Sequence, residues 1–391
     1  MGYNFKRSVE KIDNDQDINM QILTWRGYDC DECYTITFCG VTDNGKSIAV
    51  SVKDFNPYFY VKLPKKWSSV HFQHLREFCE SKDYGEVRFI GKTSKPFPKC
   101  SSPGKRKILY PFTNNELFKF WKLEFDSYEV MKRMSYCLRK SVTYGVLSNI
   151  YFDLYEANLD PLLRFGHLRE LNMSGWVKIP RKTYRQSNEM SRCQINITLS
   201  DSKKLEPIDS MLMSDIVIAS FDIECDSYAT RINNEHLYPQ EKAKCRPVFP
   251  NFRNKKDAVR IICTTFKVFN QEHILRHAIV CGETDEPESA DIVERCDTEK
   301  ELFEKWIQMI KIYNPDILTG YNLFGFDDNY MWYRMNQFYK MEKQIQSLSR
   351  LTNVQVELKD SQLITNAYGT QYFKIFDIPG IYKIDLYVYM K

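Results

Sequence analysis

Two acidic side chains, Asp222 and Glu224, stand in a short run of otherwise apolar residues, IVIASFDIE. Such a run predicts a strand that is buried on both faces, as in the interior of an α/β sheet. Because side chains alternate along a strand, the two carboxylates should point the same way while Ile223 points into the packing. Adjacent carboxylates are costly unless a cation lies between them, and hard oxygen ligands suit Mg²⁺ or Mn²⁺. The pair therefore indicates a candidate metal site.

A third carboxylate, Asp327, follows a second predicted strand. The segment DILTGYN ends that strand, and Phe326 with Asp327 begins the next helix. Open α/β sheets place their ligands at the carboxyl ends of strands. We therefore expect Asp327 to complete an acidic cluster with Asp222 and Glu224. Two metal ions held there could activate water and stabilise the leaving oxygen of a phosphodiester, with no nucleophilic side chain required.

The segments around these carboxylates predict the sheet that positions them. Residues 260–269 and 272–281 have the pattern of neighbouring strands. Residues 298–313 form a strongly amphipathic pattern, with Asp297 or Thr298 as its cap and Leu302 and Trp306 on its apolar face. Strands in a row, followed by strands that alternate with helices, are typical of a mixed α/β sheet.

The first half of the chain has a different pattern. Residues 21–52 alternate apolar and polar side chains around the turn Asp43-Asn44-Gly45, which predicts a meander of strands. Residues 67–82 predict a helix, and residues 115–127 a strand that leads to a second helix near 131–142. We expect an α+β, strand-rich N-terminal domain at 1–205 and an α/β domain at 206–391.

Length, charge and hydropathy narrow the class of protein. A chain of 391 residues favours two domains, and its net charge of +4 permits a polyanionic partner without requiring one. Six basic residues and no acidic one lie between Lys92 and Lys107, broken by prolines and a glycine. That segment predicts an irregular loop, either solvated or in contact with phosphates. No apolar run approaches a membrane span and the start lacks a signal peptide, so an intracellular, soluble protein is expected.

Twelve cysteines could suggest a metal site or a disulfide framework. The spacing Cys30-x-x-Cys33 with Cys39 lacks a second ligand pair at the distance of a zinc site. Reduced structural thiols are therefore expected.

Phe-Asp-Ile-Glu at 221–224, followed by Tyr321-Asn322 and Phe326-Asp327, resembles the first and second exonuclease motifs of family B DNA polymerases. Intervening segments match in order, and residues 358–391 resemble that family's hairpin and the start of the following helix. The segment 155–180 is similar to delta-type polymerases, as found in eukaryotes and in large DNA viruses. The resemblance covers residues 105–391 well and the first hundred loosely.

The resemblance implies a ribonuclease H-like 3′–5′ proofreading exonuclease domain that acts on a single-stranded DNA 3′ end or a primer-template. Asp222 and Glu224 would hold two Mg²⁺ or Mn²⁺ ions, and Asp327, rather than the adjacent Asp328, would be the second-motif ligand. Tyr321, Asn322 and Phe326 would shape the pocket for the terminal nucleotide, although each could simply pack or cap the turn. The implied location is the nucleus or a viral replication site.

The family's third exonuclease motif, Tyr-x-x-x-Asp, has no match between Asp327 and Lys391, since Tyr382 and Asp385 have the wrong spacing. The polymerase palm signatures are also absent from these residues. We therefore expect exonuclease activity to be impaired in this chain alone, with the polymerase half or a downstream domain as its partner. Two alternatives stay open: a non-catalytic nucleic-acid-binding or assembly module of a split polymerase, and a free-standing nuclease that acts on RNA.

Overall fold

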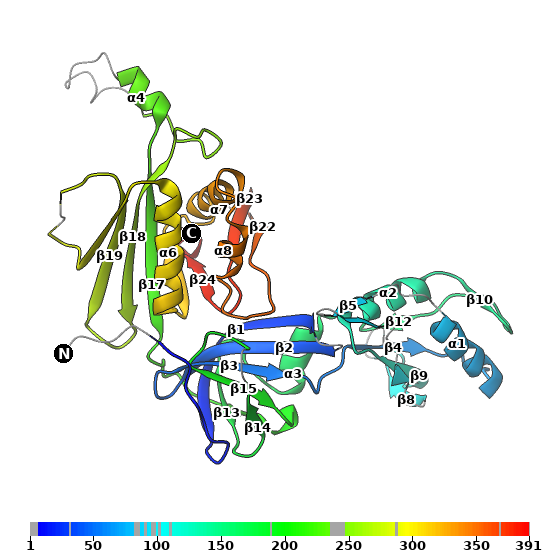
Figure 1. The fold of residues 1–391 in the computed structure, drawn as a ribbon. Helices are drawn as coiled ribbons and strands as arrows, with labels where there is room; N and C mark the ends of the chain where they lie inside the picture. Colours follow the sequence, from blue (N-terminus) through cyan, green and yellow to red (C-terminus); the bar gives the residue numbers. More distant parts are fainter. Residues whose placement is uncertain are drawn as a thin grey trace.

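The computed structural model describes residues 7–30, 33–81, 87–89, 92–94, 99–100, 103–108, 112–187, 190–234, 247–285, 288–366 and 369–390. Three main sheets organise these residues (Figure 1). Two sheets belong to the first half of the chain and the third belongs to the second half. The mixture of helices with mostly antiparallel and mixed sheets agrees with the predicted α+β and α/β classes.

The first sheet has seven strands in the order β14-β15-β3-β2-β1-β13-β16. Its strands β1, β2 and β3 form the predicted antiparallel meander, and Gly45 has a φ of 73° in the predicted turn. One pair, β15 with β3, is parallel. The bounds are β1 Ile18–Cys30, β2 Cys33–Thr42, β3 Ser47–Val52, β13 Trp176–Ile179, β14 Tyr184–Gln186, β15 Ile195–Leu199 and β16 Glu206–Ile208, with helix α3 at Pro161–Leu168 and the 3₁₀ turn η1 at Ser202–Lys204.

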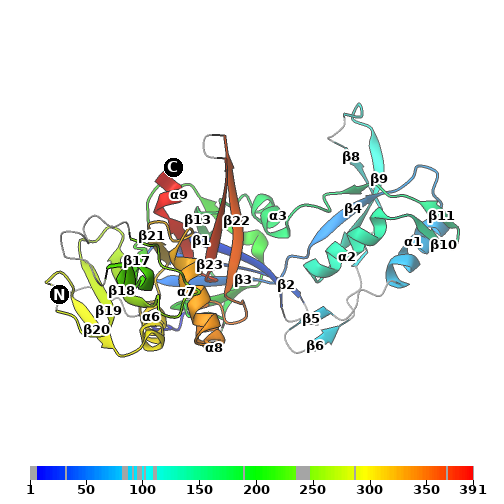
Figure 2. The ribbon, with the colours of Figure 1, turned by 90° about the horizontal axis from the view of Figure 1, so that it is seen from above.

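The second sheet has the order β12-β4-β9-β7, and β8 also pairs with β9. Helices α1 and α2 bury their apolar residues against its strands, in a cluster that contains Phe59 and Trp121 (Figure 2). The bounds are β4 Tyr58–Lys62, β7 Lys99–Cys100, β8 Gly104–Lys107, β9 Leu117–Glu124, β12 Leu154–Tyr155, α1 Ser69–Ser81 and α2 Tyr128–Arg139. Two small hairpins pair β5 Val87–Phe89 with β6 Lys92–Ser94, and β10 Val142–Tyr144 with β11 Leu147–Ile150.

The expectation of an irregular loop between Lys92 and Lys107 was wrong for the part that the structure describes. Strands β6, β7 and β8 all fall within this segment. Of its three prolines, Pro103 is described and precedes β8, so it does not remove a ladder hydrogen bond from that strand. Pro96 and Pro98 lie outside the described residues. Lys95 lies outside the described residues.

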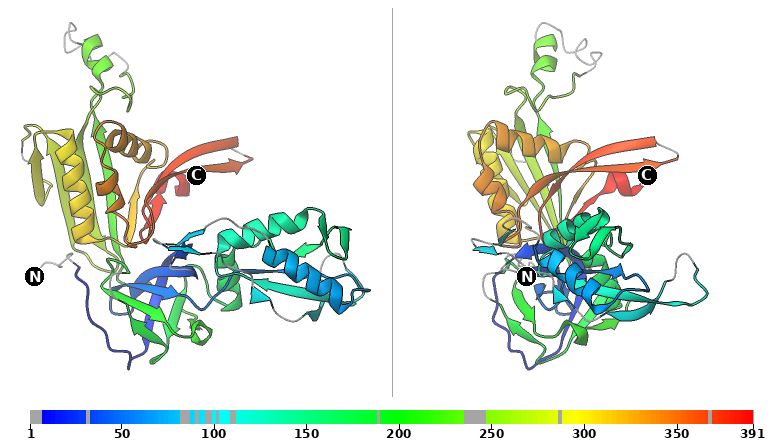
Figure 3. Two further views of the ribbon diagram at one scale, coloured as in Figure 1. Left: turned by 45° about the vertical axis from the view of Figure 1, so that its right-hand side comes forward. Right: turned by 90° about the vertical axis from the view of Figure 1, so that its right-hand side faces the viewer.

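The third sheet is mixed, as predicted, with the order β20-β19-β18-β17-β21-β24. Strand β17 is antiparallel to β18 and parallel to β21, and β21 is parallel to β24. The bounds are β17 Val217–Cys225, β18 Val259–Val268, β19 Ile274–Cys281, β20 Ile292–Cys296, β21 Ile317–Gly320, β24 Tyr382–Asp385, α4 Tyr228–Asn234, α6 Glu299–Tyr313, α7 Asp327–Gln337, α8 Glu342–Gln346 and α9 Leu386–Met390. A long hairpin of β22 Glu357–Thr365 and β23 Gly369–Asp377 projects from this part (Figure 3).

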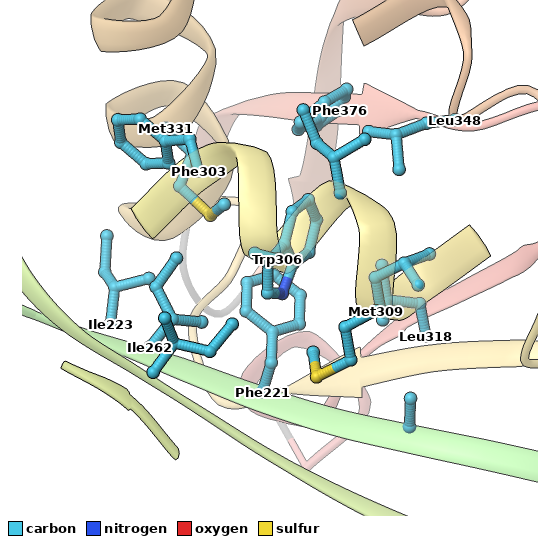
Figure 4. Packing of buried hydrophobic residues seen from close by; sticks show 14 of the residues in the cluster. Phe221, Ile223, Ile262, Phe303, Trp306, Met309, Leu318, Met331, Leu348 and Phe376 are labelled. Atoms are coloured by element: carbon cyan, nitrogen blue, oxygen red, sulfur yellow. The ribbon is translucent and has the colours of Figure 1, made fainter. Parts of the chain in front are cut away.

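Helix α6 covers one face of the third sheet (Figure 4). Thr298 caps its first turn by accepting the N–H of Glu301, as the sequence indicated. Trp306 is fully buried and lies 5.4 Å from the Phe221 ring between centroids. Burying such an aromatic pair stabilises the fold by several kcal/mol, on the order of 3–5 kcal/mol for truncation of either ring to alanine.

The prediction that β17 is buried on both faces was wrong. Its burial alternates, with Val217, Ala219, Phe221 and Ile223 buried under α6 and the residues between them half-buried or exposed. The apolar run therefore belongs to a strand with one covered face, and Asp222 and Glu224 occupy the other.

The change from the first sheet to the third falls between β16 and β17. Strand β16 pairs with β13, so the first sheet continues a few residues beyond position 205. A division of the chain into two domains near residue 205 remains our proposal. Among the described helices, none combines the length and the apolar composition needed to cross a bilayer.

Candidate active site

Asp222 and Glu224 are exposed near the carboxyl end of β17, on the face opposite to α6. In the antiparallel ladder they stand opposite Cys263 and Ile261 of β18. Both carboxylates raise the pKa of the Cys263 thiol, after the larger effect of its burial. The two acidic side chains therefore share one local environment.

Asp327 lies beside the same strand, although it is 105 residues away from Asp222 in the chain. It is the first residue of α7, it is 2% exposed, and its Oδ1 accepts the backbone N–H of Ile223 at 3.3 Å. Burial, and then the negative charge of Asp222, raise the pKa of Asp327 to about 7. An acid that is desolvated and faces a second acid is the arrangement that a bound cation relieves.

The end of β21 makes room for this contact. Strand β21 pairs with β17 only at Ile218–Ser220, so β21 does not occupy the N–H of Ile223. At Gly320, the last residue of β21, a Cβ atom would lie 2.5 Å from the carbonyl oxygen of Phe221. Only glycine allows the two backbones to approach this closely next to Asp222.

The loop between β21 and α7 holds the other three candidate residues. Tyr321 is 62% exposed, with its ring 5.5 Å from that of Tyr387. Asn322 has a φ of 62°, and its carbonyl accepts the N–H groups of Gly325 and Phe326. Phe326 is half-buried, with its ring 5.1 Å from that of Tyr330. Asn322 thus shapes the turn and Phe326 packs, while contact of all three with a nucleotide remains a prediction.

One residue of this site was missed by the sequence analysis. Asp385, at the end of β24, is 3% exposed, and its carboxylate accepts the N–H groups of Asn322 at 2.8 Å and Phe324 at 2.9 Å. It also accepts the N–H of Tyr387 at 2.9 Å. Asp385 therefore holds the loop that carries Tyr321 and Asn322. No local sequence signal marks this role, because the two loop residues that Asp385 holds are 61 and 63 residues away.

The structure separates Asp328 from the candidate site. Its fully buried carboxylate pairs with Lys383 of β24 and accepts the N–H of Phe376 at 2.9 Å. Burial raises its pKa to about 6, although Lys383 opposes this shift. Asp328 therefore anchors α7 to β23 and β24, and Asp327 is the acid that faces β17.

The donor atoms near β17 suit a hard divalent cation, since all are carboxylate oxygens. Within the part of the chain that the structure describes, however, no three His, Cys, Asp or Glu side chains are already grouped as a metal site. Asp327 and Asp222 interact, and Glu224 lies two residues further along the strand. Like-charged carboxylates repel each other unless a cation compensates them.

Comparison with known proteins identifies the family of this chain. A family model described as "DNA polymerase family B, exonuclease domain" matches residues 152–391, which include all six strands of the third sheet. The chain belongs to DNA polymerase family B. The predicted resemblance is therefore confirmed, and so is the kinship with delta-type and viral enzymes shown by the individual relatives.

The relatives of this family B chain include DNA polymerases from large DNA viruses and from eukaryotes. It is 25% identical to a DNA polymerase of Pyramimonas orientalis virus and 26% identical to one of Acanthamoeba polyphaga mimivirus, in each case over 98% of this chain. It is 25% identical to the DNA polymerase delta catalytic subunit of Schizosaccharomyces pombe over 90% of this chain. The matched regions cover 41%, 21% and 30% of those proteins, respectively.

A solved structure supports the fold of the family B chain over nearly its whole length. The family B DNA polymerase of the archaeon Pyrobaculum calidifontis superposes with a TM-score of 0.54 and 15% sequence identity. The match covers 94% of this chain and 36% of the archaeal one.

Proposed function

We propose that this chain is the N-terminal and 3′–5′ exonuclease portion of a DNA-directed DNA polymerase that acts in DNA replication. The observation that carries the proposal is the contact of Asp327 with the N–H of Ile223, beside Asp222. This contact joins the first and second candidate motifs at one point of a sheet that belongs to the family B exonuclease domain. We interpret that sheet as ribonuclease H-like.

The proposed reaction is hydrolysis of the last phosphodiester at a DNA 3′ end. The oxygen of water forms a bond to phosphorus, the bond to the 3′ oxygen of the preceding nucleotide breaks, and that oxygen takes a proton. Asp222, Glu224 and Asp327 would hold two Mg²⁺ or Mn²⁺ ions, which when bound activate water and offset the charge of the leaving oxygen. Tyr321, Asn322 and Phe326 would border the terminal nucleotide, in a loop held in place by Asp385.

Activity of these 391 residues by themselves should be weak. The family's third motif would add a fourth carboxylate and a tyrosine, and no Tyr-x-x-x-Asp sequence follows Asp327 here. With fewer ligands the second ion is held poorly and the water is oriented poorly. The partner that supplies the remaining groups would be the polymerase half or a downstream domain.

Binding of Mn²⁺ is the primary test, because it does not depend on turnover. We expect calorimetry on the 391-residue chain to detect Mn²⁺ binding that is weakened at least about tenfold by Asp222→Asn or Asp327→Asn. Glu304→Gln on the exposed side of α6 removes one negative charge elsewhere and should leave binding unchanged. Equal binding by all four proteins would refute the proposed metal site.

Hydrolysis is the second test. A 5′-labelled single-stranded DNA should shorten from its 3′ end only with Mg²⁺ or Mn²⁺, slowly, and not with Asp222→Ala. Rapid digestion by the isolated chain would contradict the expected impairment while supporting the exonuclease assignment. DNA binding that depends on salt alone, with no metal binding, would favour the non-catalytic binding or assembly module. Faster trimming of RNA than of DNA would favour the nuclease that acts on RNA.

A further inference from the structure

The second sheet has one face that helices α1 and α2 do not cover. Side chains of β9 alternate, and Trp121 and Leu123 are fully buried in the cluster formed with α1 and α2. Phe118, Phe120 and Lys122 therefore lie on the opposite face. Helix α3 reaches this side of the sheet at Tyr58, where the Arg164 guanidinium lies 4.1 Å over the tyrosine ring.

The pairing of the strands extends this face across the sheet. Lys122 stands opposite Tyr60 of β4, and Tyr60 stands opposite Tyr155 of β12. On the other side of β9, Arg106 of β8 stands opposite Phe118. Residues directly opposite each other in an antiparallel pair share a face. We call this surface the aromatic–basic face; it consists of Tyr58, Tyr60, Lys62, Arg106, Phe118, Phe120, Lys122, Glu124 and Tyr155.

The rings of the aromatic–basic face form a connected group. Phe120 lies 6.3 Å from Tyr60 and 5.2 Å from Tyr155 between ring centroids, and both contacts are edge-to-face. Phe120 is 5% exposed, whereas the two tyrosines are half-buried. The Arg106 guanidinium lies over the Tyr60 ring at 4.8 Å. Tyrosine rings and an arginine plane side by side are surfaces on which nucleic-acid bases stack.

Strand β8, at the edge of the sheet, adds three cations beside these rings. Arg106 shares their face, whereas Lys105 and Lys107 stand opposite Lys119 and Leu117 of the other face and line the same cavity. Gly104, Lys105, Arg106 and Lys107 are all exposed. No described carboxylate forms an ion pair with Lys105, Arg106 or Lys107. Lys62 and Lys122, in contrast, have Asp153 and Glu124 as partners. The three cations of β8 are thus available for a polyanion.

A cavity of about 650 Å³ joins the rings to the cations. Its lining includes Tyr60, Phe120, Tyr155, Lys105, Arg106 and Lys107. Glu156 is the one acidic residue of this lining, and its carboxylate pairs with Arg164 at 3.0 Å. The cavity therefore combines aromatic walls with net positive charge.

We infer that the aromatic–basic face and strand β8 form a binding site for single-stranded DNA, separate from the carboxylates on β17. Bases would stack on Tyr60 and Tyr155, and phosphates would contact Lys105, Arg106 and Lys107. Recognition by stacking and charge is tolerant of sequence, because every base has an aromatic face. The choice of DNA rests on the proposed function, whereas the existence of the site rests only on the second sheet.

The test measures binding of fluorescein-labelled dT16 to the 391-residue chain by anisotropy in EDTA, which prevents metal-dependent hydrolysis. The double variant Arg106→Glu/Lys107→Glu should bind at least about tenfold more weakly. The same two charge reversals at exposed Lys182 and Arg185, in the first sheet, should change the Kd less than twofold. Because the β8 side chains are exposed, the double variant should keep its Tm.

The stacking contribution has its own variant and its own readout. Tyr60→Leu should weaken binding about fivefold or more, since one stacked base contributes roughly 1–3 kcal/mol. A DNA strand that carries 4-thiothymidine should crosslink to peptides that contain residues 58–62 or 154–155.

In the charge-reversal variant, the slope of log K against log salt should become shallower by about 0.7 for each phosphate that the protein no longer neutralises.

Several outcomes would overturn the inference. Unchanged DNA binding by both variants would do so, as would crosslinks confined to other segments. A preference of at least about tenfold for RNA of the same length would also contradict it. Self-association of the chain that Arg106→Glu/Lys107→Glu abolishes would instead identify the face as a contact between two copies. Failure of the exonuclease is distinguishable from these results. A chain that binds DNA through β8 but binds no Mn²⁺ would refute the proposed function and leave the inferred site intact.

Discussion

The carboxylate of Asp327 accepts a hydrogen bond from the backbone N–H of Ile223, the residue between Asp222 and Glu224. The bond places a buried acid at the start of α7 against an exposed acidic pair on β17. One such contact joins two segments that are about a hundred residues apart. Burial and the negative charge of Asp222 raise the pKa of Asp327, whereas this hydrogen bond opposes the shift. Removal of the Asp327 charge should therefore have opposite effects with and without metal.

Without metal, Asp327→Asn should stabilise the protein above pH 7. In the parent chain the pKa of Asp327 is raised to about 7 in the folded state, so the folded state binds a proton more tightly than the unfolded state does. Stability of the parent chain should therefore fall as pH rises from about 4 to 7 and stay low above pH 7. The Asn variant should lack this dependence and melt at least about 3 °C higher at pH 8.

With 5 mM Mn²⁺ at pH 8 the order should reverse, because the parent chain gains stability by binding the ion and the Asn variant does not. Thermal melts with EDTA and with Mn²⁺ measure both effects, and Glu304→Gln serves as the control. A parent Tm that is indifferent to Mn²⁺ would argue against a cation at Asp327.

Lys383→Met should destabilise the third sheet, more strongly at high pH. The substitution leaves the fully buried Asp328 without its cation, and breaking a buried pair costs about 3–5 kcal/mol. Because burial raises the pKa of Asp328 to about 6, the carboxyl can take up a proton below that pH and lose its charge. Urea unfolding at pH 8 and pH 5 should show the larger loss at pH 8. Lys374→Met, which breaks an exposed pair with Asp360 in the hairpin, should cost less than about 1 kcal/mol at both values.

Asp385→Asn should loosen the loop at 321–324 without unfolding the chain. The Asp385 carboxylate accepts three backbone N–H groups, and an asparagine offers only one oxygen in its place. Hydrogen exchange at the amides of Asn322 and Phe324 should accelerate by about tenfold or more, and any 3′–5′ trimming should slow in parallel. Amides of β18 report on the rest of the sheet and should keep their protection. Unchanged exchange at both loop amides would show that Asp385 does not hold the loop.

Local patterns predicted those parts of the molecule whose determinants are close together in the chain. The cap at Thr298, the apolar face around Trp306 and the turn at Gly45 each depend on a few neighbouring residues. The common face of Asp222 and Glu224 follows from strand geometry alone.

The remaining features depend on partners that are distant in sequence. Whether the second face of β17 is covered depends on elements elsewhere, so the apolar run at 217–223 was overinterpreted. Strand β8 exists because β9 pairs with it, despite proline and glycine nearby. The role of Asp385 became visible only when β24 was placed beside β21.

The arm at the start of the described chain reaches the third sheet. Arg7 donates to Asp316 Oδ1 at 2.8 Å, and Arg350 donates to the same oxygen of this fully buried carboxylate at 3.1 Å. During synthesis Arg350 is added 34 residues after Asp316, whereas Arg7 is added 309 residues before Asp316. The three side chains can therefore form these buried ion pairs only after most of the chain has been translated. The N-terminal segment around Arg7 thus joins the third sheet late in folding.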